Sequence, residues 1–153
     1  MDEKTYMESV IAMQRALYRV ARSVLNNDAD AADAVQETVM KGWLARRSLR
    51  RADALKAWLM RILVNECRNI QRREGRRRDA ERKLAEESAR AYDGGNVADA
   101  LAALPEKYRL IVTLHYIEGY GYSEIAKITG MAEGLVKSRL YQARKALGSI
   151  LEE

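Results

Sequence analysis

The sequence predicts an all-α fold of two small helical bundles joined by a charged tether. In several segments apolar residues recur three and four positions apart, which is the spacing of one buried helix face. The 153 residues include one proline and no phenylalanine, so Leu, Ile, Val, Ala and Met must build most of the cores. Between residues 76 and 96 this pattern stops, and charged and small residues dominate. We therefore predict a first domain at 1–75, a linker at 76–96 and a second domain at 97–153.

Three amphipathic segments predict the first bundle. They cover about residues 5–25, 28–44 and 52–71. The side chains expected to face the core are Val10, Met13, Leu17, Val20, Ala21, Val24 and Leu25 in the first segment, Val35, Trp43 and either Val39 or Met40 in the second, and Leu55, Trp58, Leu59, Ile62, Leu63, Cys67 and Ile70 in the third. Asp28 or Asp30 is expected to cap the second helix, because a side-chain oxygen there accepts a hydrogen bond from a free backbone amide.

A second bundle is predicted to begin near Val97. Pro105 suits the first turn of a helix that runs to Glu118, and Gly119 suits its end. The apolar side of that helix is expected to contain Tyr108, Ile111, Val112, Leu114 and Ile117. Within the tether, the spacing indicates only a marginal helix at about 79–91.

A helix-turn-helix is indicated by the residue types at its turn. The helix from Tyr122 to Thr129 turns Ile125, Ala126 and Ile128 inward, and Ala126 is small enough for a second helix to cross closely. Gly130 tolerates the positive φ that ends such a helix. The next helix, at about 132–147, is expected to bury either Leu135 or Val136, followed by Leu140, Ala143 and Leu147.

The other face of this last helix is cationic and rich in hydrogen-bonding groups. It carries Lys137, Ser138, Arg139, Tyr141, Gln142, Arg144 and Lys145. A helix that enters the major groove of DNA requires such a face. The solvated face of an ordinary bundle has a similar composition, but the small residue, the turn glycine and the core residue in register favour DNA binding. Tyr141 has a second interpretation, which is packing against the preceding helix.

Composition excludes several other classes. No apolar run is long enough to span a membrane and the polar segment 1–7 is unlike a signal peptide, so we expect a cytoplasmic protein. Cys67 lies in an apolar run and is expected to be a core residue, while the single His115 lacks partners for a zinc site. No pair of catalytic groups can be assembled, so we expect no enzyme, cofactor or small-molecule substrate.

The middle of the chain carries a concentration of positive charge. Residues 46–78 contain twelve Lys and Arg against three acidic residues, which indicates a second contact with a polyanion.

Both predicted domains resemble the extracytoplasmic-function sigma factors of bacterial RNA polymerase. The second domain is similar to their region 4 at residues 104–109, 117–119, 122–126, 133–134, 136–140 and 143–147. The first domain is similar to one helix of their region 2 at Asp33, Val35, Gln36, Glu37 and Trp43, and to the helix used in promoter opening at Ala57, Trp58, Leu59, Arg61, Ile62 and Asn65. The resemblance covers nearly the whole chain apart from the tether.

The resemblance implies a factor that directs core RNA polymerase, through its clamp and flap regions, to promoter DNA. Asp33, Gln36 and Glu37 would dock on the clamp coiled coil, although on spacing alone a solvated face is an equal interpretation. Arg61 and Asn65 share one side of a helix and would contact the downstream, minus-ten element. The residues implied for the upstream, minus-thirty-five element are Lys137, Ser138, Arg139, Tyr141, Gln142 and Arg144. A cognate anti-sigma factor that holds the domains in an inactive arrangement is also implied.

Several positions depart from the pattern of that family, among them Val39, where an aromatic residue is usual, and the loop at 46–51, which is short and has no aromatic residue. Gly121 replaces a frequent capping serine, but Glu124, three residues later, remains. Ala132 stands at the expected cap of the recognition helix, where alanine forgoes a bond worth ~1 kcal/mol. Leu135 replaces a common threonine and Gln142 a common arginine, and the latter change predicts a distinct upstream-element preference.

Two other functions are compatible with parts of the sequence. A conventional helix-turn-helix regulator would bind DNA without polymerase and would give no role to Arg61 or Asn65. A helical protein that only interacts with polymerase would not need Lys137 or Arg144. Promoter-dependent transcription with core polymerase separates both from a sigma factor.

Overall fold

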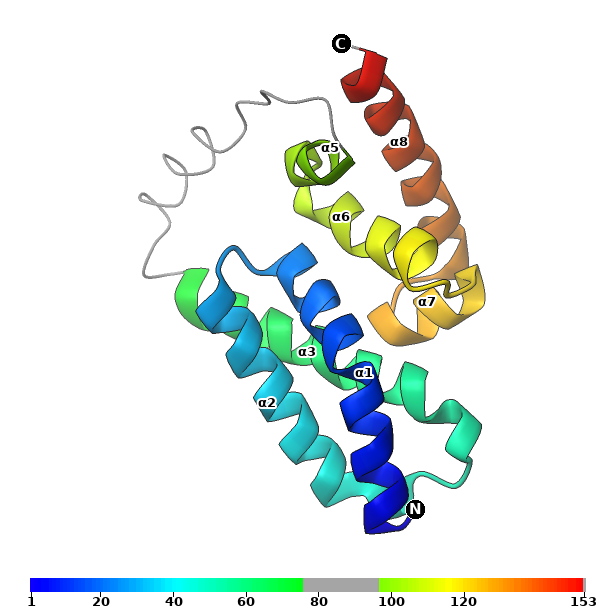
Figure 1. Ribbon diagram of the computed structural model, residues 1–153. Helices are drawn as coiled ribbons and strands as arrows, with labels where there is room; N and C mark the ends of the chain where they lie inside the picture. Colours follow the sequence, from blue (N-terminus) through cyan, green and yellow to red (C-terminus); the bar gives the residue numbers. More distant parts are fainter. Residues whose placement is uncertain (76–96, 153) are drawn as a thin grey trace.

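The computed structural model describes residues 1–75 and 97–152, and these are helical, with short connections and no strand among them. The first bundle contains α1 (Glu3–Val24), α2 (Asp28–Ala45), the 3-10 turns η1 (Arg46–Ser48) and η2 (Ala52–Ala54), and α3 (Leu55–Gly75). The second contains α5 (Val97–Ala103), α6 (Glu106–Val112), η3 (Thr113–Ile117), α7 (Tyr122–Thr129) and α8 (Glu133–Glu152) (Figure 1). The predicted all-α class is confirmed. The tether at 76–96 and its marginal helix lie outside the described residues, so the domain boundaries stay predictions.

The core of the first bundle follows the predicted periodicity on α1 and α3. All seven inward residues predicted for α1 are buried. On α3 the buried apolar residues are Leu55, Leu59, Met60, Leu63, Val64, Cys67 and Ile70. The prediction omitted Met60 and Val64, whereas Trp58 and Ile62 are only half-buried. The reason is that α3 is covered on more than one side, so its buried face is wider than a single stripe.

Small residues, rather than large ones, form the buried face of α2. Ala31, Ala34, Thr38 and Gly42 are its buried residues. Val39 is half-buried, which resolves the choice between Val39 and Met40, because Met40 is 61% exposed. Small side chains let α2 approach both α1 and α3 closely.

Gly42 is required by this close approach. A Cβ atom at Gly42 would collide with the hydroxyl of Tyr6 and would lie 2.9 Å from Cδ2 of Leu59. Tyr6 has no room to yield, because it is fully buried and its hydroxyl donates a hydrogen bond of 2.7 Å to the carbonyl oxygen of Val39.

Gly42→Val should therefore lower the free energy of unfolding by about 1–3 kcal/mol through overpacking. Urea denaturation followed by circular dichroism measures this loss. The matched control is Gly148→Val on α8, where a Cβ meets nothing within 4 Å. Equal losses at the two positions would show that steric crowding is not the cause.

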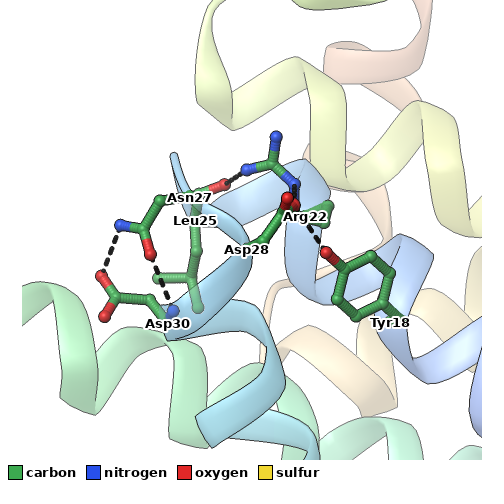
Figure 2. A network of polar contacts seen from close by, with 6 residues as sticks. All are labelled: Tyr18, Arg22, Leu25, Asn27, Asp28 and Asp30. Carbon is green, nitrogen blue, oxygen red and sulfur yellow. Dashed lines mark hydrogen bonds and ion pairs between the residues drawn. The ribbon is translucent and has the colours of Figure 1, made fainter.

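The turn between α1 and α2 is held by side chains that close on the backbone (Figure 2). Asn27 caps α2: its Oδ1 accepts a 2.7 Å hydrogen bond from the amide of Asp30. The predicted cap at Asp28 or Asp30 is therefore wrong. Asp28 instead turns back to α1, where its carboxylate accepts a hydrogen bond from Tyr18 and pairs with Arg22. The chain leaves α1 one residue earlier than the prediction assumed, which moves the cap to Asn27.

The predicted helix from Pro105 to Glu118 is interrupted by a π turn. Residues 113–117 form η3, closed by a hydrogen bond from the amide of Glu118 to the carbonyl oxygen of Thr113. A π turn accommodates an extra residue, so later side chains rotate relative to a 3.6-residue period. As a result Ile117 is 48% exposed and does not join the apolar side as predicted. Gly119 follows with a φ of 82°, as expected for the stop.

The two bundles pack against each other and share one apolar core. α3 lies beside α7, and α1 beside α6 (Figure 1). The shared cluster joins residues of α1–α3 to Ile111, Leu114, Ile125, Ile128, Val136 and Leu140. Periodicity alone predicted separate cores, because it does not reveal which buried faces meet across the tether.

Cys67 lies within this core and is fully buried. Burial raises the pKa of its thiol to about 12, so the thiol stays protonated near neutral pH. This supports the predicted structural role of Cys67 over a nucleophilic one.

Among the described helices, none is both long and apolar enough to cross a membrane.

Candidate nucleic-acid and polymerase interfaces

One side of α3 presents the residues predicted to contact the downstream element. Arg61 and Asn65 are exposed one helical turn apart. The same side continues with Arg68, three residues beyond Asn65. Arg68 is half-buried and donates a 2.8 Å hydrogen bond to the carbonyl oxygen of Thr129 at the end of α7. Arg61 and Asn65 thus lie on one exposed side of α3, as predicted. The end of α7 is hydrogen-bonded to the same side, next to this pair.

The helix-turn-helix has the predicted turn. α7 begins and ends at the predicted residues, and Gly130 adopts a left-handed φ of 76°. Ile125 and Ile128 are buried, whereas Ala126 is half-buried. At the start of α7 the backbone amide of Gly121 donates a 3.2 Å hydrogen bond to the carboxylate of Glu124, so the glutamate half of the capping box is formed.

Two further contacts hold the turn that precedes α7. The Nδ1 atom of His115 donates a 2.8 Å hydrogen bond to the carbonyl oxygen of Tyr120. The amide of Tyr120 donates to the carbonyl oxygen of Leu114. His115 therefore has a structural role that positions the helix-turn-helix, as its isolation in the sequence indicated.

α8 presents most of the residues predicted for the upstream element on its exposed side. Its buried side is formed by Val136, Leu140 and Ala143. The exposed predicted residues are Lys137, Ser138, Tyr141, Gln142 and Arg144. Tyr141 is 51% exposed, with the Nζ atom of Lys145 4.9 Å from its ring centroid, so it does not pack against α7. Five of the six predicted residues are therefore accessible to a ligand.

Arg139 is set apart from this group. It is half-buried, and its NH1 lies 3.7 Å from the sulfur of Met131. It also lines a cavity of about 410 Å³ between the bundles, together with Val24, Val64, Arg68, Gln71, Pro105, Glu106, Lys107, Leu110, Ile111 and Met131. Its predicted role at DNA would require it to leave this position.

Ala132, whose methyl side chain cannot accept a hydrogen bond, begins the first turn of α8. The carbonyl oxygen of Ala132 accepts hydrogen bonds from the amides of Leu135 and Val136, at 3.0 and 3.1 Å, which places Ala132 at the start of the helix as predicted. Glu133 in this turn approaches Lys137 at 4.0 Å. The methyl side chain of Ala132 leaves the first amides available to a phosphate.

Asp33, Gln36 and Glu37 are all exposed on α2 and line a shallow groove between α2 and α3. The other lining residues are Met40, Lys41, Glu66, Asn69, Ile70, Arg72 and Arg73. Inside the groove the nearly buried carboxylate of Glu66 forms an ion pair with Lys41. An exposed apolar strip, Met40 and Leu44, lies along α2 beyond Glu37. A protein partner that offers cations and apolar side chains would fit this surface.

Polar contacts between described residues also join the bundles, besides the shared core. Arg19 on α1 forms a two-pronged ion pair with Glu118, at 2.7 and 3.2 Å, and the Glu118 side chain is only 8% exposed. This hydrogen bond raises the pKa of the Arg19 guanidinium. Further contacts run from Arg68 to Thr129, from Gln71 to Glu106 and from Arg109 to the carbonyl oxygen of Ser23.

The described side chains form no cluster of His, Cys, Asp or Glu that could hold a metal ion.

Some of these residues were missed by sequence reasoning. Arg68 could have been found, because it continues the three- and four-residue spacing of Arg61 and Asn65. Its bond to Thr129 could not, because no local signal joins positions so far apart in the chain. Lys41 and Met40 were also missed at the groove, since neither disturbs the helical pattern of α2.

Two packed helical bundles, with a helix-turn-helix in the second and exposed, acid-poor faces on α3 and α8, have the architecture of a transcription initiation factor of the sigma-70 type. Family models agree: residues 10–77 match Sigma-70 region 2, and residues 95–147 match Sigma-70 region 4.

Curated relatives are similar over most of their length. The RNA polymerase sigma factor SigV of Bacillus subtilis is 32% identical over 134 residues, which cover 85% of this chain and 81% of SigV. The ECF RNA polymerase sigma factor SigM of Mycobacterium tuberculosis is 33% identical over 141 residues, covering 90% and 72%. The chain belongs to the extracytoplasmic-function sigma factors, and it directs RNA polymerase to promoters. Neither alternative, a conventional regulator or a mere interaction protein, is favoured.

Two solved structures share the fold. One is the sigma factor RpoE in complex with the anti-sigma factor NepR from Bartonella quintana, with a TM-score of 0.76, 28% identity and coverage of 97% of this chain and 98% of RpoE. The other is CnrH in complex with the cytosolic domain of CnrY, with a TM-score of 0.71, 29% identity and coverage of 99% and 90%.

Proposed function

We propose that the two exposed DNA faces divide promoter recognition between them. α8 reads the upstream element through Lys137, Ser138, Tyr141, Gln142 and Arg144, and Arg139 joins them when the bundles separate. The side of α3 that carries Arg61 and Asn65 takes the downstream element, with Arg61 on a phosphate and Asn65 on an unpaired base. The observation that carries this proposal is the presence of two acid-poor, exposed helix faces on two different bundles.

The groove between α2 and α3 is the proposed site for the polymerase clamp, with Asp33, Gln36 and Glu37 on its rim. The second bundle would contact the flap. This chain acts by binding and positioning, not as an enzyme, and its place of action is the cytoplasm, where polymerase and promoter meet, and the nucleoid once it is bound to polymerase.

Promoter binding requires the two bundles to separate. Elements centred near minus ten and minus thirty-five are about 25 base pairs apart, or about 85 Å along the duplex. A compact chain of this length has a diameter of only about 40 Å. The packed arrangement is therefore a closed state that cannot reach both elements at once.

A cognate anti-sigma factor would act by stabilising this closed state. The two solved relatives of the same fold were determined in complexes with NepR and with the cytosolic domain of CnrY. A partner that binds only the closed arrangement shifts the equilibrium away from promoter-competent molecules. The contacts from Arg19 and Arg68 across the bundles are the ones that such a partner would preserve.

Reconstitution tests the proposal. The purified chain is added to sigma-free core polymerase, and promoter-dependent run-off transcripts are scored. We expect transcripts with the wild-type chain, and loss of core binding when Asp33 and Glu37 are both changed to lysine. Tight DNA binding without polymerase, combined with no initiation, would contradict the proposed division of roles.

A further inference from the structure

We propose that Leu135 reads the C5-methyl group of a thymine in the upstream promoter element. This inference rests on the proposed function of α8 as the helix that enters the major groove. The sequence left open which of two neighbours is buried. The structure buries Val136 completely and leaves Leu135 42% exposed. An apolar side chain thus stands on a helix face that is otherwise cationic and polar.

A single exposed leucine is ordinary on a protein surface, so its position has to carry the inference. Leu135 lies in the first turn of α8, where its amide bonds to the carbonyl oxygen of Ala132. The N-terminal residues of a recognition helix are those that reach base edges. Gly134 precedes it, and a Cβ atom there would meet nothing within 4 Å. The edge of a base can therefore approach the backbone closely at this turn.

The neighbours of Leu135 on the helix surface favour the same kind of base pair. Leu135, Ser138 and Gln142 are three and four residues apart, so they share one side of α8, and all three are exposed. Glutamine pairs with the N6 and N7 atoms of adenine, and an apolar side chain contacts the methyl group of thymine. Both are features of A·T pairs in the major groove. This side of α8 is therefore suited to an A·T-containing upstream element.

Charge favours DNA over a protein as the occupant of this face. Lys137, Arg144 and Lys145 are exposed on the same helix. They complement the phosphate backbone beside the groove. With such flanking charges, the apolar contact at Leu135 supplies sequence preference rather than overall attraction.

The test uses the complete chain bound to core polymerase. A promoter library with a randomised upstream element is selected by transcription. We expect one thymine to be enriched by the wild-type chain and not by Leu135→Ala. Deoxyuridine is then placed at that thymine, which removes one methyl group and keeps the base pair. Binding by the wild-type holoenzyme should weaken about three- to fivefold, the effect of one buried methyl group, while Leu135→Ala should bind both DNAs equally.

Ile117→Ala is the matched control. Ile117 is 48% exposed and apolar, but it lies on η3 outside the recognition helix, so this variant should retain the preference for thymine over deoxyuridine. Equal binding of the two DNAs by the wild-type holoenzyme would overturn the inference. Leu135→Ala that weakens binding yet still prefers thymine would also overturn it. If the wild-type chain enriches no upstream sequence at all, the proposed role of α8 fails first, and the role of Leu135 with it.

Discussion

Replacing Asn65 with alanine should slow promoter opening about ten- to a hundredfold and leave the affinity for core polymerase unchanged. A base that leaves the duplex loses stacking worth a few kcal/mol, which contacts to the extruded base must offset. Asn65 is exposed on α3 and offers both a donor and an acceptor to such a base. Arg61, one turn earlier, would hold the adjacent phosphate, so Arg61→Ala should act in the same direction.

Opening is followed by the fluorescence of 2-aminopurine placed in the downstream element, and core binding by anisotropy of the labelled chain. The matched control is Lys56→Ala, which removes an exposed cation from a different side of α3. This control should open promoters at the wild-type rate. If Asn65→Ala and Arg61→Ala lose core binding in proportion to opening, the side of α3 has been misassigned and belongs to the polymerase interface.

The elements that could be predicted are those whose apolar period is regular. α1, and α8 as far as its side chains are described, follow a three- and four-residue spacing, so their buried faces were predicted almost residue by residue; Leu147, expected in the core, is half-buried. The turn glycines Gly119 and Gly130 were also predictable, because each adopts a positive φ that disfavours other residues.

The errors have local physical causes. The π turn at Thr113–Ile117 adds a residue to the helical period, and no residue type signals it. On α2 the close packing is carried by Gly42 and two alanines, which contribute little to any hydrophobic pattern. Asn27 displaced the predicted aspartates as cap, because capping strengths of Asn and Asp are nearly equal and position alone decides between them.

The relation between the bundles lay beyond sequence reasoning. Both Arg19 and Glu118 look like ordinary surface charges, because each occupies a polar position in its own segment. They meet only because α1 and η3 pack together, and the pair is then half-shielded from water. The individual site residues could thus be predicted from the sequence. The hydrogen bond by which Arg68, beside the downstream face, contacts the end of α7 could not.

Breaking the contact between Arg19 and Glu118 should open the closed state. In Glu118→Arg, two guanidinium groups would face each other where a two-pronged ion pair now joins the bundles. Like charges at a shielded position repel, and the loss of the pair removes one of the polar links between the bundles. We propose that clamp and flap can be engaged together only in the open state, so the variant should bind core polymerase roughly two- to fivefold more tightly than the wild type.

Energy transfer between dyes measures the opening directly. Glu8 and Lys127 are exposed on opposite bundles, and each is replaced by cysteine for labelling, while native Cys67 is buried and stays unreactive. Transfer should fall in Glu118→Arg and return in the double variant Arg19→Glu with Glu118→Arg, which restores the pair with its charges exchanged. Unchanged transfer in the single variant would show that the apolar core alone holds the bundles together. A fall that the exchange does not reverse would mean that packing around Glu118, rather than the ion pair, keeps the chain closed.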